Sequence, residues 1–244
     1  MALSIDLSNK TVLITGGATG IGYGMACAFL EAGADVIVTA KTKTSLDLCK
    51  EETSYGVMKK YMLDVTNDIS ISELLEEIGD LDVLVNNAGS IKGGIEFRFE
   101  NFADIVNVNL MGVMRVTHEC FPKIALKRGC IINISSIYAV FGAAHAPSYS
   151  ATKTGLISLT KSMAACWAEH GVRVNGIAPG WINTKLSAPA KKDPDRIKKI
   201  MDRIPMGRWG EAKEIGGAAV FLASDQASYI TGTTIFIDGG YTAN

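Results

Sequence analysis

Paired cysteines, metal-ligand spacings and long apolar runs are all missing from this 244-residue chain. Its five cysteines include no Cys-x-x-Cys pair and its three histidines show no ligand spacing, so we expect reduced thiols and no structural metal. No stretch approaches about 18 uncharged apolar residues, the length that a spanning helix needs. The first residues also lack a basic region followed by an apolar core. These absences predict a soluble, cytoplasmic protein with no membrane partner.

An excess of charge of either sign is missing too, because 24 Lys and Arg residues face 25 Asp and Glu residues. This balance provides no basic field for nucleic acid or anionic lipid, which leaves a small molecule as the expected partner. Hydrophobic residues make up 48% of the chain, enough to bury one large core. No repeat, low-complexity tract or linker appears. We therefore expect a single domain over residues 1–244.

Short apolar runs rich in β-branched residues recur along the chain with helical segments between them. The predicted strands are 11–15, 35–39, a run ending near 62–64, 82–86, 130–134, 172–177 and 233–237. The predicted helices are about 20–32, 67–78, 100–127, 148–169 and 211–223. This alternation indicates βαβ units on a parallel sheet, hence an α/β fold. The segment at about 185–206, rich in proline and charge, is expected to form a mobile flap.

A hydroxyl, a phenol and an ammonium stand at an informative spacing in Ser136-x12-Tyr149-x3-Lys153. Residues four apart on a helix share a face, so Lys153 can sit beside Tyr149 and favour its phenolate. Tyr149 would then act as an acid near neutral pH. Ser136 follows a predicted strand and can donate a hydrogen bond to a substrate oxygen as charge develops there. Each residue alone has a plain structural explanation, but together they indicate hydride-transfer chemistry.

A glycine-rich turn, 15–22, follows the first predicted strand and opens the first predicted helix. Glycines let such a turn tighten and let its backbone approach a pyrophosphate, which then meets the positive end of the helix. Taken alone, the turn could be a mere chain reversal. Its position between strand and helix favours a dinucleotide site. The residues expected to contact the cofactor here are Gly16, Thr19, Gly20, Ile21 and Gly22.

Two further strand ends are expected at the same edge of the sheet. Asn86-Asn87-Ala88-Gly89 ends the fourth predicted strand, and we expect Asn87, Ala88 and Gly89 to border the cofactor. A purely structural turn stays open for Asn86 and Asn87, since asparagine side chains hold turns by bonding the backbone. Asp64 and Val65 end the third predicted strand. Asp64 could accept a bond from an adenine amino group, or cap a helix or turn instead.

Three of these patterns, in this order, resemble the short-chain dehydrogenase/reductase family over the whole chain. They are Thr-Gly-x3-Gly-x-Gly at 15–22, Asn-Asn-Ala-Gly at 86–89 and Tyr-x3-Lys at 149–153. The resemblance implies a single-domain, Rossmann-like, doubly wound seven-stranded parallel sheet flanked by helices on both faces. It also implies an enzyme that uses a nicotinamide cofactor and usually assembles into a homotetramer, its helices at about 100–127 and 148–169 pairing across a two-fold axis.

The same resemblance assigns roles to further residues. Tyr149 and Lys153 would border the cofactor, with Lys153 bonding the nicotinamide ribose hydroxyls, and Asn109 would bind a water that continues a proton relay. The stretch 179–184 fits the family's clamp on the nicotinamide amide, although its Pro-Gly pair alone would be an ordinary turn. The clamp residues are Pro179, Gly180, Ile182 and Thr184.

The end of the second predicted strand bears on the choice of cofactor. An acidic residue there would accept bonds from the adenosine ribose and repel a 2′-phosphate, but Ala40 occupies the position. Lys41 matches the position where NADP-using relatives carry a basic residue. We therefore expect NADP(H) to be favoured over NAD(H). Thr19, at a position often basic in strongly NADP-specific relatives, departs from that pattern, and Lys41 could be an ordinary surface lysine.

Substrate choice rests on the loop 141–148, the flap and the chain end, which carry no readable code. Cations that could meet an anionic substrate are Lys92, Lys185 and Arg208, whereas His145 reads more as a satisfied loop residue. The stretches 22–26, 146–149 and 203–210 resemble the gluconate 5-dehydrogenases and 2-dehydro-3-deoxygluconate dehydrogenases. We therefore favour a keto-sugar acid, or another small polar carbonyl or polyol, as the substrate.

Two alternatives stay open. The general body also resembles 3-oxoacyl-carrier-protein reductases, which reduce a thioester-bound ketone and dock an acidic carrier with two arginines. Lys127 and His170 hold those docking positions here, which weakens the match. A cofactor-binding regulator without turnover is the alternative from another class. Such proteins often lose a catalytic residue, whereas this chain keeps Asn109, Ser136, Tyr149 and Lys153.

Overall fold

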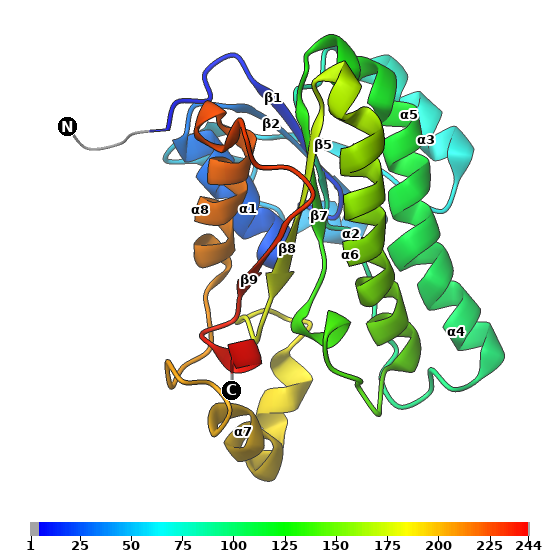
Figure 1. Ribbon diagram of the computed structural model, residues 1–244, viewed down its shortest axis with the longest axis vertical. Coiled ribbons are helices and arrows are strands. Elements are labelled where there is room, and N and C mark those ends of the chain that lie inside the picture. Colours follow the sequence, from blue (N-terminus) through cyan, green and yellow to red (C-terminus); the bar gives the residue numbers. More distant parts are fainter. Residues whose placement is uncertain (1–4, 244) are drawn as a thin grey trace.

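Seven parallel strands form the central sheet of the computed structural model, which describes residues 5–243 (Figure 1). The strands are β1 (Thr11–Ile14), β2 (Asp35–Ala40), β5 (Lys59–Met62), β6 (Val83–Asn86), β7 (Cys130–Ile134), β8 (Arg173–Pro179) and β9 (Thr234–Ile237). Their order is β5-β2-β1-β6-β7-β8-β9. Every predicted strand is present, and the α/β fold class is confirmed. Two further strands of two residues each, β3 (Glu52–Thr53) and β4 (Gly56–Val57), form a separate antiparallel pair that was not predicted.

The strand order places a switch in winding direction beside β1. β1 pairs with β2 on one side and with β6 on the other, so Ile14 lies in register with both Val38 and Val85. The chain winds outward from β1 in one direction as far as β5, and then returns to continue in the other direction from β6. Ligands of open α/β sheets bind at such a point, outside the carboxyl ends of the strands.

Helices cover both faces of the sheet, as expected. α1 (Gly20–Glu31) and α8 (Ala212–Ala223) pack on one face, and α3 (Asp68–Glu77), α5 (Gly112–Leu126) and α6 (Pro147–Trp167) pack on the other (Figure 1). Each face has its own apolar core, since alternate side chains of a buried strand point to opposite faces. A short helix, α2 (Lys43–Asp47), follows β2.

The helix predicted over about 100–127 contains a wider turn that the sequence did not indicate. α4 (Phe99–Val106) runs into a π-helical turn at Asn107–Met111 and continues as α5. Such turns occur mostly as single insertions within α-helices and frequently at functional sites. Asn109 lies in this turn and is fully buried. The turn therefore sets which face of the helix Asn109 presents.

The flap region is ordered by a small core of its own. A 3-10 turn at Ala188–Lys192 leads to α7 (Pro194–Met201), whose first turn is capped by the side chain of Asp193. α7 lies beyond the carboxyl ends of the strands, near the end of the chain (Figure 1). Its apolar side packs into a third cluster of buried residues, formed by Ile137, Ala190, Ile200, Ile204, Trp209 and Tyr241.

Two adjacent glycines in α8 differ in how much space surrounds them. A Cβ at Gly216 would lie 2.6 Å from the Cβ of Ala28 and 3.0 Å from the carbonyl oxygen of Gly24, both in α1. A Cβ at Gly217 would meet no atom within 4 Å. The close packing of α1 on α8 therefore depends on the first glycine and not on the second.

We expect Gly216→Ala and Gly217→Ala to change stability in opposite directions. Replacing glycine by alanine in a helix contributes roughly 0.5–1 kcal/mol, so Gly217→Ala should raise the melting temperature. At Gly216 the clash with α1 adds an overpacking cost of about 1–3 kcal/mol, so the melting temperature should fall. Thermal unfolding of the two variants checks this, and a rise in both would show that the helices separate at little cost.

Candidate active site

The predicted catalytic residues meet where β7 ends and α6 begins. Ser136 lies just beyond β7, 8% exposed, and its Oγ accepts a hydrogen bond of 3.2 Å from the backbone N–H of Tyr138. Tyr149 is half-buried in the first turn of α6, and Lys153 is buried one turn further along. The Nζ of Lys153 lies 5.5 Å from the centroid of the Tyr149 ring. The spacing read from the sequence thus places the three side chains together.

The pKa of Tyr149 differs from the sequence-based expectation. Burial of the phenol raises its pKa to about 12, hydrogen bonding with Ser136 lowers it only in part, and Tyr138 and Glu96 add to the rise. The ammonium of Lys153 lies beside the ring and donates a 2.7 Å bond to the carbonyl oxygen of Ile134. The phenol of Tyr149 is therefore protonated at neutral pH.

Lys153 is a buried cation with little compensation. Desolvation lowers its pKa from 10.5 to about 8. No carboxylate of residues 5–243 lies within 4 Å of its Nζ, and the Ile134 carbonyl is its hydrogen-bond acceptor within that range. Burying such a charge costs free energy that hydrogen bonds offset in part. This local cost points to a functional rather than a stabilising role.

Asn109 faces the loop that follows β6. Its side-chain oxygen accepts a 2.8 Å bond from the N–H of Ser90, and its Nδ2 donates a 2.9 Å bond to the Ser90 carbonyl. Nδ2 also lies 3.4 Å from the hydroxyl of Thr152 in α6. A Cβ added to Gly89 would lie 3.3 Å from Oδ1 of Asn109 and 3.7 Å from Nζ of Lys153. Asn109 and Gly89 therefore border the same small space as Lys153.

Buried side-chain hydrogen bonds fix α6 along the sheet. Asn133 of β7 donates to the hydroxyl of Thr160 in α6, 2.9 Å away, and accepts a 2.9 Å bond from Asn86 of β6. Ser135 donates a 2.7 Å bond to the backbone carbonyl of Lys153. Asn86 is thus a structural residue inside the sheet, one of the two alternatives that its sequence context left open.

A buried carboxylate at the start of α6 was missed from the sequence. Glu96, fully buried, accepts bonds from the hydroxyl of Ser148 at 2.6 Å and from the backbone N–H of Tyr149 at 3.0 Å. Its other oxygen accepts a 2.8 Å bond from the N–H of Lys92. Negative charge at a helix N-terminus is stabilised by the free N–H groups there. Glu96 therefore fixes the turn that carries Tyr149, and only its surroundings in space reveal this.

The glycine-rich turn lies between β1 and α1, as predicted, and so stands at the switch point of the sheet. Gly16 and Gly20 adopt φ angles of 62° and 59°, which side chains disfavour, and a Cβ at Gly22 would lie 2.6 Å from Nδ2 of Asn87. Asn87 donates bonds of 3.0 Å to the carbonyls of Thr15 and Gly16. Its side chain therefore holds the turn, while its neighbours Ala88 and Gly89 remain beside it.

The backbone around this turn fits a dinucleotide. The first turn of α1 contains no acidic residue, and Thr19 at its N-cap is exposed and makes no side-chain capping bond, which leaves the helix N-terminus available to a phosphate group. Thr184 lies against the turn, since a Cβ at Gly20 would be 3.6 Å from its Cγ2. Ile182 is buried in a bridge to Gly210. The predicted clamp thus lies beside the glycine-rich turn.

Lys41 forms an ion pair beside the end of β2. Its Nζ lies 2.8 Å from Oδ2 of Asp64, while the other oxygen of Asp64 accepts bonds from the N–H and the hydroxyl of Thr66. Burial opposes the charge of Asp64, but these bonds hold its pKa below the usual value. Of the two alternatives for Asp64, the structure displays the turn-holding contacts. Lys41 is 65% exposed in its side chain and keeps donors free.

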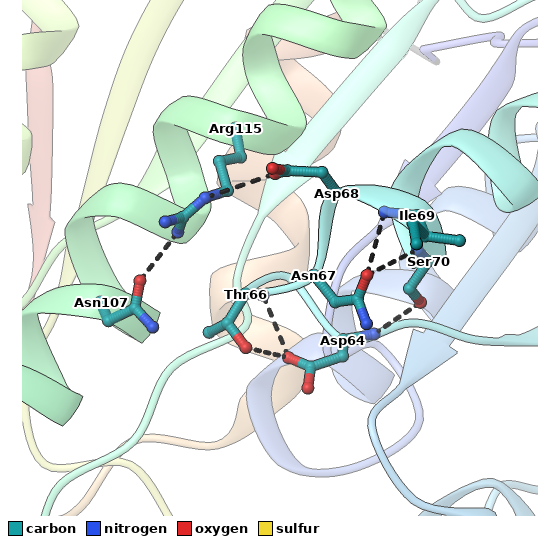
Figure 2. Close-up of polar contacts among 8 residues, drawn as sticks. All are labelled: Asp64, Thr66, Asn67, Asp68, Ile69, Ser70, Asn107 and Arg115. Atoms are coloured by element: carbon teal, nitrogen blue, oxygen red, sulfur yellow. Dashed lines mark hydrogen bonds and ion pairs between the residues drawn. The ribbon is translucent and has the colours of Figure 1, made fainter.

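Figure 2 shows how the turn after β5 is anchored. Asn67 caps α3 by accepting bonds from the backbone of Ile69 and Ser70, and Arg115 of α5 reaches both Asp68 and Asn107. Arg115 thereby links this turn to the π-helical segment. Val65 packs against the start of α5, where a Cβ at Gly112 would lie 2.8 Å from Cγ2 of Val65. The turn at 64–67, after β5, is thus held by α3 and α5.

Two of the three cations expected to meet an anionic substrate are engaged elsewhere. Lys92 pairs with Asp104 at 2.6 Å, and Arg208 forms two bonds of 2.7 and 2.9 Å with Glu214. That pair lowers the pKa of Glu214 to about 2. Lys185 is exposed. The Arg208–Glu214 pair helps fix the start of α8, where Glu214 completes a capping box.

Other features bear on the expected partners. No described helix has both the length and the apolar character needed to cross a membrane. Within residues 5–243, no cluster of three or more His, Cys, Asp or Glu side chains is arranged to hold a metal ion. Lys127, at one of the carrier-docking positions, pairs with Asp80 at 2.6 Å.

A doubly wound sheet with a glycine-rich turn at its switch point is the architecture of dinucleotide-binding proteins. Comparison with known proteins agrees. A family model described as enoyl-(acyl carrier protein) reductase matches residues 16–242. The chain is 38% identical over 253 residues to a 2-dehydro-3-deoxy-D-gluconate 5-dehydrogenase of Dickeya dadantii, covering 98% of each. It is 40% identical over 244 residues to a 3-oxoacyl-acyl-carrier-protein reductase of Thermotoga maritima, covering 96% of this chain and 98% of the relative.

A solved structure extends the likeness to three dimensions. The gluconate 5-dehydrogenase of Burkholderia cenocepacia, in complex with NADP and tartrate, superposes with a TM-score of 0.90 at 31% identity, covering 99% of this chain and 98% of that one. The chain therefore belongs to the short-chain dehydrogenase/reductase family, and it is an NAD(P)-dependent oxidoreductase. The resemblance read from the three sequence motifs is confirmed.

We expect Lys153→Met to stabilise the protein at neutral pH. Each pKa unit corresponds to about 1.4 kcal/mol, so a pKa of about 8 in place of 10.5 costs the folded state up to roughly 3 kcal/mol while Lys153 is charged. Between these two values the unfolded chain binds more protons, so the cost falls as pH rises. Urea unfolding should favour the variant at pH 7, with the gap closing towards pH 10.5.

The matched control is Lys161→Met, which removes an exposed lysine from the same helix and should leave the unfolding free energy nearly unchanged at every pH. Equal or lower stability of Lys153→Met at pH 7 would contradict the prediction. It would show that the bond to the Ile134 carbonyl outweighs the burial cost of the charge.

Proposed function

We propose that this chain is an NADP(H)-dependent reductase that converts the ketone of a small sugar acid to a secondary alcohol, with Tyr149 as the proton donor. The observation that carries the proposal is the meeting of Tyr149 with Ser136 and Lys153, at the edge of the sheet that carries the glycine-rich turn. A phenol holds its proton at neutral pH and can therefore donate it to the oxygen of a carbonyl as that carbonyl is reduced.

Each residue of the group has a distinct task in this proposal. Tyr149 gives its proton to the carbonyl oxygen, and Ser136 donates a hydrogen bond to the same oxygen as its charge grows. Lys153 supplies a positive charge below the phenol ring, which stabilises the phenolate once the proton has left. Asn109 holds the loop that carries Gly89 through its two bonds to Ser90.

The glycine-rich turn, the loop after β6 and the clamp at 179–184 would hold the cofactor, which supplies the hydride when bound. Gly16, Gly20 and Gly22 allow the backbone to approach a pyrophosphate, with Thr19 and Ile21 in the first turn of α1. Ala88 and Gly89 would line the nicotinamide side together with Pro179, Gly180, Ile182 and Thr184. Asp64 and Val65 would border the adenine.

The preference for NADP(H) is supported by Lys41 and by the lack of an acid at Ala40. An ammonium has three donors, so Lys41 can keep its bond to Asp64 and still pair with a 2′-phosphate. Asp64 lessens the net positive charge at this place, which predicts a moderate preference rather than a strict one. The related gluconate 5-dehydrogenase structure contains NADP.

A sugar acid is favoured over a carrier-bound thioester by two observations. The relatives include sugar-acid dehydrogenases, and one of them was solved with tartrate, a hydroxy acid. Lys127, one of the positions that would dock an acidic carrier, is paired with Asp80. The reductase of Thermotoga maritima, at 40% identity, keeps thioester reduction as the second candidate function.

We also propose the assembly and the setting of the enzyme. Phe97 and Phe99, each 79% exposed, project near the start of α4, where pairing with a second copy would cover them. This supports a homotetramer, which we place in the cytoplasm. The chain would act as one catalytic domain over 1–244, with the segment at about 185–206 moving as a flap over the substrate.

Initial rates with NADPH and NADH against 5-ketogluconate and an acetoacetyl thioester test the proposal. We expect turnover of the keto-sugar acid, with NADPH favoured. Thioester turnover alone would replace the sugar acid by the second candidate function. Silence of the purified enzyme with every ketone tried would favour a regulator without turnover.

The control for this assay is Tyr149→Phe, which removes the proton donor and keeps the ring. General acid catalysis contributes roughly 10²- to 10⁴-fold, so kcat should fall by about that factor. NADPH binding, followed by the fluorescence of the reduced nicotinamide, should be retained. A near-normal rate in the variant would assign the proton to another group.

Cofactor preference is tested by Ala40→Asp, which places a carboxylate beside the expected 2′-phosphate. The ratio of kcat/KM for NADPH to that for NADH should fall by about tenfold, the factor that corresponds to about 1.4 kcal/mol. Because Ala40 is buried, Lys41→Gln is a second variant, expected to raise the KM for NADPH while leaving that for NADH unchanged.

Lys43→Gln, which removes an exposed cation two residues further on, is the matched control. It should leave the KM for NADPH and the KM for NADH unchanged. An unchanged ratio in both Ala40→Asp and Lys41→Gln would overturn the assignment of the 2′-phosphate site to this strand end.

A further inference from the structure

We propose that Arg196, on the flap helix α7, binds the carboxylate of the sugar-acid substrate while the substrate ketone faces Tyr149. The proposal rests on the function proposed above and names the residue that selects an acid over a neutral carbonyl. It replaces the three cations considered from the sequence, two of which are engaged elsewhere. Arg196 was not among them.

The position of Arg196 is set by contacts from two other segments. Its Nη2 lies 3.3 Å from Nε2 of His145, in the loop before α6. Its Cζ lies 5.9 Å from the centroid of the Trp181 ring, in the segment after β8. Arg196 is half-buried, so its side chain is turned inward from α7, whereas Lys198 and Lys199 of the same helix are exposed.

One aromatic side chain separates Arg196 from the catalytic phenol. The ring centroid of Tyr138 lies 5.9 Å from that of His145, 6.2 Å from that of Trp181 and 6.2 Å from that of Tyr149. Arg196 therefore contacts two of the three rings that surround Tyr138, and Tyr149 is the third. In the proposed pose the hydroxylated carbon chain of the substrate passes Tyr138, with its ketone at Tyr149 and its carboxylate at Arg196.

The guanidinium of Arg196 has donors left for a further acceptor. No carboxylate of residues 5–243 lies within 4 Å of the guanidinium, whose polar contacts are the ring nitrogen of His145 and the phenol of Tyr138. Burial and the nearby guanidinium lower the pKa of His145, so the ring is neutral near pH 7 and its nitrogen can accept the bond. A guanidinium has five donors in a planar fork that matches a carboxylate.

A second unsatisfied donor lies in the same cluster. The indole N–H of Trp181 is buried and has no hydrogen-bond partner among the described residues. Buried donors without acceptors are uncommon, and each one calls for an explanation. Two neighbouring donors that lack an anionic or carbonyl acceptor are consistent with a site for an oxygen-rich, negatively charged ligand.

The other arginine of the flap is used differently. Arg203 lies 4.7 Å from the Phe141 ring and 4.3 Å from the Tyr241 ring, measured from Cζ to the centroids. Those stacked contacts hold the end of the flap to the chain end. Arg196 thus differs from Arg203 in lying beside the rings that lead to Tyr149.

The test compares Arg196→Gln with the wild-type enzyme on a charged and an uncharged ketone, 5-ketogluconate and fructose, with saturating NADPH. Loss of a charge-assisted pair should raise the KM for 5-ketogluconate by about 10- to 100-fold. The kcat/KM for fructose should stay within about twofold. Arg196→Lys, which keeps the charge without the fork, should recover part of the loss. Lys199→Gln, on the same helix, should change nothing.

Binding of gluconate to the NADPH complex, measured by calorimetry, separates the two proposals. Gluconate binding by the wild type that is lost in Arg196→Gln supports the site even if 5-ketogluconate is not reduced. Equal losses on both ketones, or an unchanged KM for 5-ketogluconate in Arg196→Gln, would overturn the role of Arg196 while leaving the proposed function intact. If the wild-type enzyme neither binds gluconate nor reduces 5-ketogluconate, both proposals are overturned.

Discussion

The arrangement of the site depends on buried side-chain hydrogen bonds that hold α6 in one register against β7. Asn133 joins β7 to α6 through Thr160 and to β6 through Asn86, and Ser135 bonds the carbonyl of Lys153. Apolar packing alone is tolerant of small shifts, whereas a buried donor or acceptor left without its partner costs about 1–3 kcal/mol. These bonds therefore specify the position of α6, and with it the meeting of Tyr149 and Lys153 with Ser136.

Charge in the site is arranged at the expense of stability. Lys153 carries a buried ammonium whose acceptor is a backbone carbonyl. The carboxylate of Glu96 instead accepts bonds from the N–H of Tyr149 and the hydroxyl of Ser148. Burial, Tyr138 and Glu96 raise the pKa of the phenol, and in the proposed mechanism the nearby ammonium would stabilise the phenolate after proton loss. The two charges lie at different places along α6, so they do not neutralise each other. In the proposed mechanism this arrangement would preorganise the site for a change of charge on Tyr149.

Features that depend on a periodic pattern or on a short motif could be predicted from the sequence. Strands and helices followed from apolar periodicity, and the glycine-rich turn and the Tyr-Lys spacing placed their residues correctly at one sheet edge. The π-helical turn at Asn107–Met111, the buried Glu96 and the pairing of Lys41 with Asp64 were not predicted, because each depends on a partner distant in the chain. The rise in the pKa of Tyr149 was not predicted for the same reason: spacing puts Lys153 beside the ring, but the rise comes mainly from burial of the phenol, which depends on residues distant in the chain.

The flap is attached to the rest of the fold differently from the elements that carry Ser136 and Tyr149. In the proposed function a ketone held by Ser136 and Tyr149 would be bound by elements fixed to the sheet, whereas Arg196 belongs to a short helix with a separate small core. A substrate that must reach both would join the flap to the sheet edge, so part of its binding energy would be used to place the flap. A neutral ketone would reach only the rigid part. Selection of acids would then appear in KM and in flap closure together, because the same guanidinium would serve both.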